Sequence, residues 1–148
     1  MNENYDNLKL ENQLCFPLYV WSKEVVRRYK PLLDALDLTY TQYITMMAMW
    51  ENRNLNVKKL GKILFLDSGT LTPVLKKLEQ KGYIERHRAD EDERNLIIQI
   101  TKKGMDLRKK AKNIPGKIGK CVNLTPSEAE NLYKTLYKIL GSINVEGI

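Results

Sequence analysis

The sequence predicts a mainly α-helical protein with one small β-hairpin. Apolar residues recur at helical spacing along most of the 148 residues, whereas strict alternation of apolar and polar residues is confined to a short region after Gly82. With 43% apolar and 29% charged residues, the composition is typical of a globular chain with a hydrophobic core. A single domain over residues 1–148 is therefore expected.

The first helix is expected over about residues 8–36. Leu14, Leu18 and Trp21 recur there at helical spacing, within a run that is almost uncharged. Pro17 is tolerated only near the first turn of a helix, so the helix either starts later than residue 8 or bends at Pro17.

Two shorter helices follow, over residues 41–52 and 57–65. Thr39 or Thr41 caps the first of them, and Asn56 caps the second. In the first of the two, the side chains expected to face inward are those of Ile44, Met47 and Ala48.

A fourth helix begins after Asp67, which is a good capping residue. Its buried face is marked by Leu71, Val74, Leu75 and Leu78. Pro73 lies past the first turn and predicts a small local distortion, and Gly82 is expected to end the helix. The segments 83–88 and 95–100 then alternate as two strands joined by a highly charged turn, which predicts a β-hairpin.

The C-terminal part is again helical. Thr101 starts a helix over residues 102–114, which is interrupted around Pro115 and Gly116. The last helix begins with a capping box formed by Thr125 and Glu128. Its apolar side consists of Ala129, Leu132, Leu136, Ile139 and Leu140.

The net charge of +7 is concentrated in the middle third of the chain. Residues 58–110 contain 14 Lys/Arg and 8 Asp/Glu, whereas the remaining residues contain 11 and 10. Such a concentration is the electrostatic footprint of a protein that binds nucleic acid or another anionic surface. A solubilising surface would give the same pattern, so charge alone leaves both interpretations open.

The central order of elements is helix, helix, helix, strand, charged turn, strand, which is the order of a winged helix-turn-helix. The major groove of DNA admits one helix, whose short polar side chains reach base edges. Neighbouring lysines neutralise phosphates, and an arginine at the hairpin tip, held extended by a carboxylate, enters the narrow minor groove. The candidate DNA-binding residues are Ser68, Thr70, Thr72, Lys76, Lys77, Arg86, Asp92 and Arg94.

The segment LFLDSGTLTPVLKKLEQKGYIERHRADEDERNLIIQITKKG resembles the DNA-binding core of the MarR family of bacterial regulators, with DERNL and ITKKG matching its wing and next helix. LENQLCFPLY together with LDSGTLTP resembles the organic hydroperoxide regulator (OhrR) branch. The resemblance covers roughly residues 10–140. It implies a homodimer held by N- and C-terminal dimerisation helices (1–36 and 102–148), with two winged-helix lobes (40–100) reading a pseudo-palindromic operator. It also implies repression that an organic hydroperoxide relieves.

Cys15 is the candidate sensor, because a thiolate is the nucleophile towards a peroxide and hydrogen-bond donors near the sulfur favour that form. The resemblance implies that Tyr29 and Tyr40 donate phenolic hydroxyls to the sulfur across the dimer. Tyr19, one helical turn beyond Cys15, is a further candidate. The apolar neighbours Phe16 and Trp21 would favour alkyl or lipid hydroperoxides over hydrogen peroxide.

Cys121 leaves two interpretations open. Within the family that the sequence resembles, a second cysteine in this part of the chain resolves the sulfenic acid in one branch, whereas a small thiol caps it in another. The surroundings of Cys121 are basic, which favours a thiolate, but the resemblance is poor around residues 112–123.

Two rival functions also remain open. One is a regulator released by a small phenolic or anionic ligand, with Cys15 not redox-active. The other is a thiol peroxidase, which would not explain Thr70, Lys76 and Arg94; we expect no enzyme.

Two cysteines and one histidine make a structural zinc site unexpected, and no cofactor is implied. The N-terminus lacks a secretory signal, and no apolar run reaches the roughly 20 residues that cross a bilayer, so a cytoplasmic protein is expected.

Overall fold

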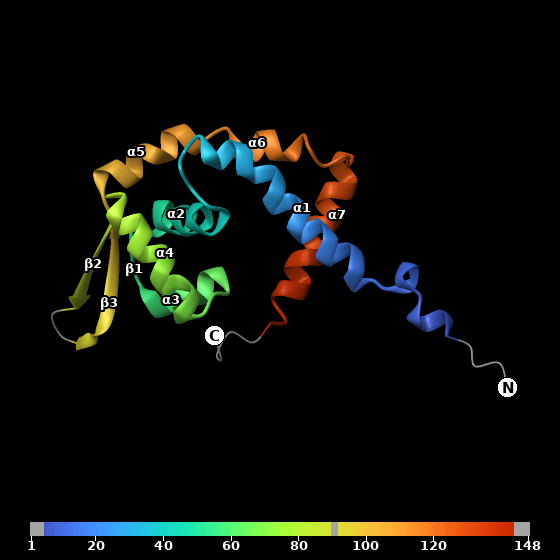
Figure 1. The fold of residues 1–148 in the computed structure, drawn as a ribbon, viewed down its shortest axis with the longest axis horizontal. Coiled ribbons are helices and arrows are strands. Elements are labelled where there is room, and N and C mark those ends of the chain that lie inside the picture. The colour runs from blue at the N-terminus through green and yellow to red at the C-terminus, as the bar shows by residue number, and fades with distance from the viewer. Residues whose placement is uncertain (1–4, 90–91, 144–148) are drawn as a thin grey trace.

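The computed structural model describes residues 5–89 and 92–143; of residues 89 and 92–95 it describes the backbone alone. The chain is mainly helical with a small antiparallel sheet, as predicted (Figure 1). Two short 3₁₀ turns come first, η1 (Asp6–Leu8) and η2 (Leu10–Asn12). The α-helices are α1 (Cys15–Asp34), α2 (Tyr40–Asn52), α3 (Val57–Leu64), α4 (Ser68–Gln80), α5 (Lys102–Ala111), α6 (Ile114–Gly119) and α7 (Pro126–Leu140). The strands are β1 (Asn54–Asn56), β2 (Ile84–Ala89) and β3 (Asp92–Ile100).

The helices α2 to α5 and the sheet form a lobe with a continuous hydrophobic core. Met46 and Met49 of α2, together with Leu71, Leu75 and Leu78 of α4, are almost completely buried. The predicted hairpin is confirmed, with β3 between β1 and β2 in an antiparallel sheet. Strand β1 was not predicted, because three residues carry too little periodicity to indicate a strand.

Local capping chemistry explains where the helices of the lobe begin. Thr39 accepts a hydrogen bond from the backbone N–H of Gln42, whose side chain accepts one from the Thr39 N–H in return, so that Thr39 rather than Thr41 caps α2. Asn56 and Asp67 cap α3 and α4 by accepting hydrogen bonds from the backbone N–H groups of Lys59 and Thr70, without the reciprocal bond. Thr101 caps α5 and also donates its hydroxyl proton to the Gly82 carbonyl, which ties the helix to the end of the preceding turn.

Two glycines allow backbone segments to approach closely. A Cβ at Gly61 would lie 2.7 Å from the Leu66 carbonyl oxygen, and a Cβ at Gly104 would lie 2.2 Å from that of Tyr83. The carbonyl of Gly104 in turn accepts a 2.8 Å hydrogen bond from the buried indole N–H of Trp50. The seam between α5 and the rest of the lobe therefore requires glycine at position 104.

Three predictions about the helices need correction. The first helix begins at Cys15 and not near residue 8, because the preceding residues form 3₁₀ turns and α1 carries Pro17 in its first turn. The interruption after α5 falls at residues 112–113, and Pro115 lies inside the first turn of α6, where proline is tolerated. Met47 does not face inward: its side chain is 44% exposed.

The two ends of the chain differ from the lobe in their burial. No residue of α7 is buried in the described structure, although its apolar face is the predicted one. In α1, only Leu33 is buried, and many apolar side chains of its first half are exposed. Figure 1 shows α1 and the preceding segment extending away from the lobe, on the side opposite to the hairpin. No described helix is long and apolar enough to cross a membrane.

Candidate redox site and DNA interface

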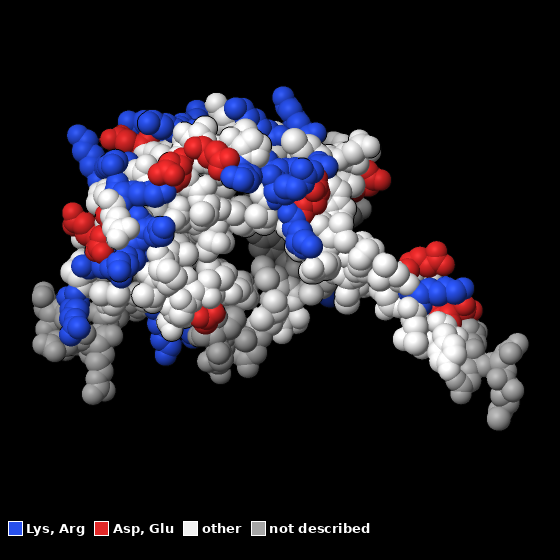
Figure 2. Space-filling view, in the orientation of Figure 1, with Lys and Arg blue, Asp and Glu red and all other residues white. Residues whose placement is uncertain are grey.

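Cys15 is the first residue of α1 and is exposed. The neighbouring Leu14 is 77% exposed and provides no side-chain cap, so the backbone N–H groups of the first turn remain open to an anionic group. Residues 13–22 contain no charged side chain, and Figure 2 shows this part of α1 as an uncharged surface. The sulfur thus lies at the start of an exposed apolar strip.

A cluster of three phenols, hereafter the tyrosine cluster, lies where α1 meets α2. The ring of Tyr29 is 5.0 Å from that of Tyr40 and 5.7 Å from that of Tyr43, centroid to centroid. Burial, with smaller contributions from the other two tyrosines, raises the pKa of Tyr29 to about 12. Burial also raises the pKa of Tyr40 and Tyr43 above the ordinary 10. All three hydroxyls therefore keep their protons at neutral pH.

The hydroxyls of the tyrosine cluster have no hydrogen-bond partner among the described residues. A protonated phenol without a partner is an available donor. Sequence reasoning identified Tyr29 and Tyr40 but missed Tyr43, which lies three residues after Tyr40 and so on the same face of α2.

Within one chain, Cys15 cannot reach this cluster. Both Cys15 and Tyr29 belong to the continuous helix α1, and a rise of 1.5 Å per residue separates them by about 21 Å. Tyr19, one turn from Cys15, is exposed, and its hydroxyl accepts a 3.2 Å hydrogen bond from Lys23. Of the predicted redox residues, only Tyr19 therefore lies near Cys15 within the same chain.

Cys121 follows α6 and is exposed. Its sulfur lies 3.4 Å from the Lys117 carbonyl oxygen, to which the thiol donates, and its own carbonyl accepts a hydrogen bond from Arg28 of α1. Arg28 also pairs with Glu24 at 2.8 Å. Because Arg28 directly precedes Tyr29, Cys121 lies at the tyrosine-cluster end of α1, remote from the Cys15 of its own chain.

The exposed face of α4 carries the short polar side chains predicted to meet DNA. Ser68, Thr70, Thr72, Lys76 and Lys77 are all exposed. The backbone N–H and the hydroxyl of Thr70 both donate to Asp67, which lowers the pKa of that carboxyl, and the Thr72 hydroxyl donates to the Ser68 carbonyl. Both threonine oxygens keep free lone pairs that could accept hydrogen bonds from base amino groups.

The remaining DNA-binding candidates belong to the β2–β3 hairpin and not to the exposed face of α4. Arg86 is half-buried, and its Nε and Nη2 both donate to Oε2 of Glu79 of α4, at 3.0 and 2.6 Å, which fixes β2 to α4 and lowers the pKa of Glu79. The side chains of Asp92 and Arg94 lie outside the described part of the structure. Sequence reasoning missed the exposed lysines of α3, Lys58, Lys59 and Lys62, whose only signal was their place on the helix before α4.

Comparison with known proteins decides the family. Residues 27–111 match the family described as "Transcriptional regulator SarA/Rot". The chain is 46% identical to an organic hydroperoxide resistance transcriptional regulator of Bacillus subtilis, over 97% of this chain and 98% of that protein. The chain belongs to the MarR family, in its organic hydroperoxide regulator branch.

Solved structures of MarR-family regulators have the same fold. The structure is similar to that of reduced AbfR bound to DNA, with a TM-score of 0.75 and 32% identity over 92% of this chain and 96% of that one. It is also similar to disulfide-formed AbfR, with a TM-score of 0.64 and 34% identity over 91% and 95% of the two chains. For the reduced form of MarR from E. coli, the TM-score is 0.70 at 26% identity, over 86% and 96%. The lobe of this MarR-family chain is thus a winged helix-turn-helix, with α4 as the second helix of the motif and β2–β3 as the wing.

Proposed function

We propose that this MarR-family chain is a homodimeric transcriptional repressor that senses organic hydroperoxides by oxidation of Cys15 and then releases operator DNA. The observation that carries the proposal is the separation of an exposed sulfur from unpartnered phenols by about 21 Å of one continuous helix. A second copy is needed to bring them together. The B. subtilis relative is an organic hydroperoxide resistance regulator, which agrees with this chemistry.

The dimer accounts for the apolar surface of the terminal helices. In this proposal, residues 1–36 and 102–148 supply the dimerisation helices and residues 40–100 supply the DNA-binding elements, while α5 also packs into the core of the lobe. Exposed Leu132, Leu136 and Ile139 of α7, and the uncharged start of α1, become buried between the two copies. A two-fold arrangement places each Cys15 beside the tyrosine cluster of the other subunit.

The redox step uses the thiolate of Cys15. The sulfur attacks the outer oxygen of the hydroperoxide, the S–O bond forms and the O–O bond breaks. The alkoxide that leaves takes a proton and becomes an alcohol, while the sulfur loses two electrons and becomes a sulfenic acid. Phenols that donated to the thiolate lose their charged acceptor. The contact between subunits then rearranges, and the two lobes no longer match their half-sites.

In this proposal, Cys121 resolves the sulfenic acid of the other subunit. Arg28 joins the Cys121 carbonyl to the segment of α1 that contains Tyr29, so a partner sulfur that approaches Tyr29 also approaches Cys121. A disulfide needs the two Cα atoms within about 7 Å, which the separation along α1 rules out within one chain. The chain is similar to disulfide-formed AbfR, which supports disulfide formation in this chain as well.

DNA recognition uses α4 in the major groove and the wing beside it. Ser68, Thr70 and Thr72 contact base edges, while Lys76 and Lys77 contact phosphates. The half-sites of a pseudo-palindrome are then about one helical repeat apart, roughly 34–36 Å. A regulator that binds chromosomal DNA acts in the cytoplasm. The peroxide oxidises this protein, and the protein does not consume peroxide in repeated cycles as an enzyme would.

The test is operator binding by wild type, Cys15→Ser and Cys121→Ser, with and without cumene hydroperoxide. We expect the peroxide to release wild type but not Cys15→Ser, and Cys121→Ser to lose the dimer band on a non-reducing gel. Release of Cys15→Ser by cumene hydroperoxide would contradict the proposal. Formation of the same dimer band by Cys121→Ser would contradict the role of Cys121 alone.

A further inference from the structure

The segment that contains α5 and α6 carries a charge equal to that of the whole chain. Residues 101–127 contain 8 Lys/Arg and a single acidic residue, Asp106, whereas the rest of the chain contains 17 Lys/Arg and 17 Asp/Glu. Figure 2 shows Lys and Arg side chains along the upper edge of the molecule, where Figure 1 places α5 and α6. The excess positive charge is therefore local, and it lies outside the DNA-binding face formed by α4 and the wing.

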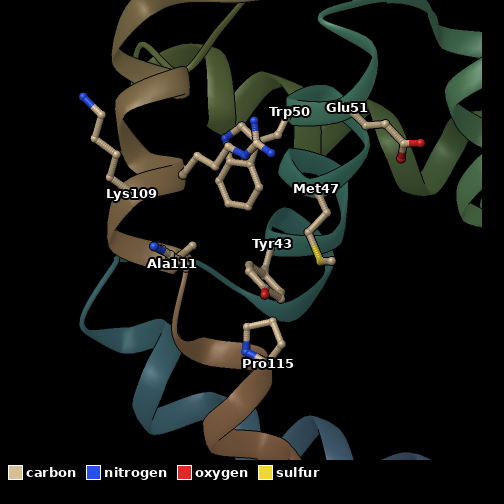
Figure 3. A pocket seen from close by; sticks show the side chains of 9 residues that line it. Tyr43, Met47, Trp50, Glu51, Lys109, Ala111 and Pro115 are labelled. Carbon is tan, nitrogen blue, oxygen red and sulfur yellow. The ribbon is translucent and has the colours of Figure 1, made fainter.

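Five exposed lysines form what we call the basic ridge: Lys102, Lys109 and Lys110 of α5, Lys117 of α6, and Lys120. Figure 3 shows Lys109 pointing away from the aromatic side chains of the pocket between α2 and α5. Asp106, the single carboxylate of these two helices, pairs with Lys109 at 3.0 Å. Among the described residues, Lys110, Lys117 and Lys120 have no ion-pair partner. Most of the charge of the ridge is thus not neutralised by the chain itself.

The basic ridge offers no apolar side chain that a second subunit could bury. The apolar residues of α5 and α6, among them Leu107, Ile114 and Ile118, are already buried in the core of their own chain. None of the exposed large apolar side chains of the described chain lies within residues 102–120. Two ridges brought together would also repel each other. Dimerisation through α7 and the start of α1 therefore leaves the ridge open to solvent.

Duplex DNA is the partner that fits such a surface. Lysines alone bind a phosphate backbone, through counterion release and without regard to sequence. The centre of a protein interface, in contrast, is enriched in aromatic residues and depleted in lysine. An anionic membrane surface would call for exposed apolar side chains that enter the lipid. The ridge has the lysines and lacks the apolar side chains.

We propose that the basic ridge holds the phosphate backbone of a second DNA duplex while α4 and the wing hold the operator. Helix α2 packs between α5 and α3, so the ridge and the helix-turn-helix lie on different sides of the lobe (Figure 1). DNA is stiff over roughly 150 base pairs, so a short operator duplex does not reach both sides of one lobe. The dimer, with two ridges besides its two reading helices, bridges two segments of duplex.

The experiment measures capture of a fluorescent duplex of scrambled sequence by full-length dimer bound to operator duplex on beads. The wild type should retain the second duplex at low salt and release it as salt rises. In Lys110→Gln/Lys117→Gln, the dissociation constant of the second duplex should rise on the order of 10-fold, and the slope of log K against log salt should fall by about 2. Operator affinity, measured by fluorescence anisotropy, should change less than about two-fold, because salt screens charges beyond roughly 10 Å.

The matched control is Lys30→Gln/Lys138→Gln, which removes the same charge from exposed positions of α1 and α7. It should capture the second duplex as the wild type does. Equal capture by the ridge variant and the wild type would overturn the inference, as would an equal loss in the control. Tighter binding of an oligoglutamate peptide than of a duplex of equal charge would also overturn it, because the ridge would then be a docking surface for protein.

Failure of the wild type to bind operator would refute the proposed function and not the ridge. The salt slope for the scrambled duplex in free solution would then test the ridge. That slope should fall by about 2 in the ridge variant, and an unchanged slope would overturn the inference.

Discussion

The DNA-binding lobe and the terminal helices of this chain are stabilised in different ways. In the lobe, Leu60, Leu71, Leu78 and Ile98 are completely buried, and side-chain caps start its helices. In α7 the helix has an equally good cap in Thr125, yet none of its apolar residues is buried in the described chain. Local signals therefore define both regions as helical, but only the lobe obtains its core from its own chain.

The difference explains why a sensor can be placed between the two regions. The tyrosine cluster lies where α1 meets the lobe, and the sulfur lies on the part of α1 that has no core of its own. A change at the sulfur can thus alter how two copies pack while each lobe keeps its internal structure. The proposed sensing residues thus belong to the region with fewer buried contacts, where rearrangement costs least.

Charges placed on the apolar face of α7 should have the largest effect. Leu132→Lys/Leu136→Lys introduces lysines at positions 44% and 42% exposed in the single chain. Each buried leucine contributes about 1.5–3 kcal/mol, so the dimer dissociation constant should rise on the order of 100-fold or more, while the lobe stays folded. Sedimentation equilibrium and circular dichroism measure the two quantities.

The control for this change is Glu130→Lys, on the opposite face of α7. It removes an exposed ion pair with Lys134, which is worth less than about 1 kcal/mol. Its dimer constant should stay close to that of the wild type. Unaltered dimerisation of the double leucine variant would show that α7 is not part of the interface.

A methyl group at Gly104 should destabilise the lobe. In Gly104→Ala the new Cβ would overlap the Tyr83 carbonyl and displace the hydrogen bond from Trp50, at a cost of about 1–3 kcal/mol in the free energy of unfolding. Gly116→Ala is the matched control, because nothing lies within 4 Å of its Cβ. Urea unfolding of both variants measures the difference, and equal stabilities would contradict the close approach of α5.

Removal of a lysine from α4 should have a smaller effect, confined to DNA. Lys76→Ala should weaken binding a few-fold for any sequence and lower the slope of log K against log salt by about 1. Lys138→Ala, on α7, should leave the slope unchanged. The readout is fluorescence anisotropy with duplex DNA at several salt concentrations; an unchanged slope for Lys76→Ala would remove that residue from the interface.

The smallest effect concerns the ionisation of Tyr29. The folded-state pKa of Tyr29, about 12, exceeds the ordinary 10, so Tyr29 binds its proton more tightly in the folded chain. Its contribution to the free energy of unfolding is therefore lost as pH rises from about 10 to 12. Ultraviolet titration of the phenolates should show a component near pH 12. Tyr29→Phe should lose that component, and Tyr133→Phe on α7 should keep it.

The sequence alone was sufficient where structure depends on neighbouring residues. The caps Asn56, Asp67 and Thr125 could be predicted because each uses a contact three residues away. The β-hairpin could be predicted because its two alternating strands follow each other directly in the sequence. Strand β1 could not, since it exists only by pairing with β3, more than 40 residues further along.

Tertiary packing explains the other misses. Met47 has helical spacing like that of its buried neighbours but lies at the rim of a pocket that α5 completes. Arg86 appeared as a free cation until its pairing with Glu79 was known. Tyr43 joins the tyrosine cluster through its contact with Tyr29, which spacing along the chain cannot reveal.

Completion of the redox centre by the partner subunit can be measured in defined heterodimers. When Cys15→Ser is paired with Tyr29→Phe, the one remaining Cys15 faces an intact Tyr29 only if the contact crosses the interface. When the double variant Cys15→Ser/Tyr29→Phe is paired with wild type, the same sulfur faces phenylalanine. We expect a wild-type rate of sulfenic acid formation in the first heterodimer and a slower rate in the second. The reverse order would show that each sulfur is served by its own chain and would contradict a redox centre shared between subunits.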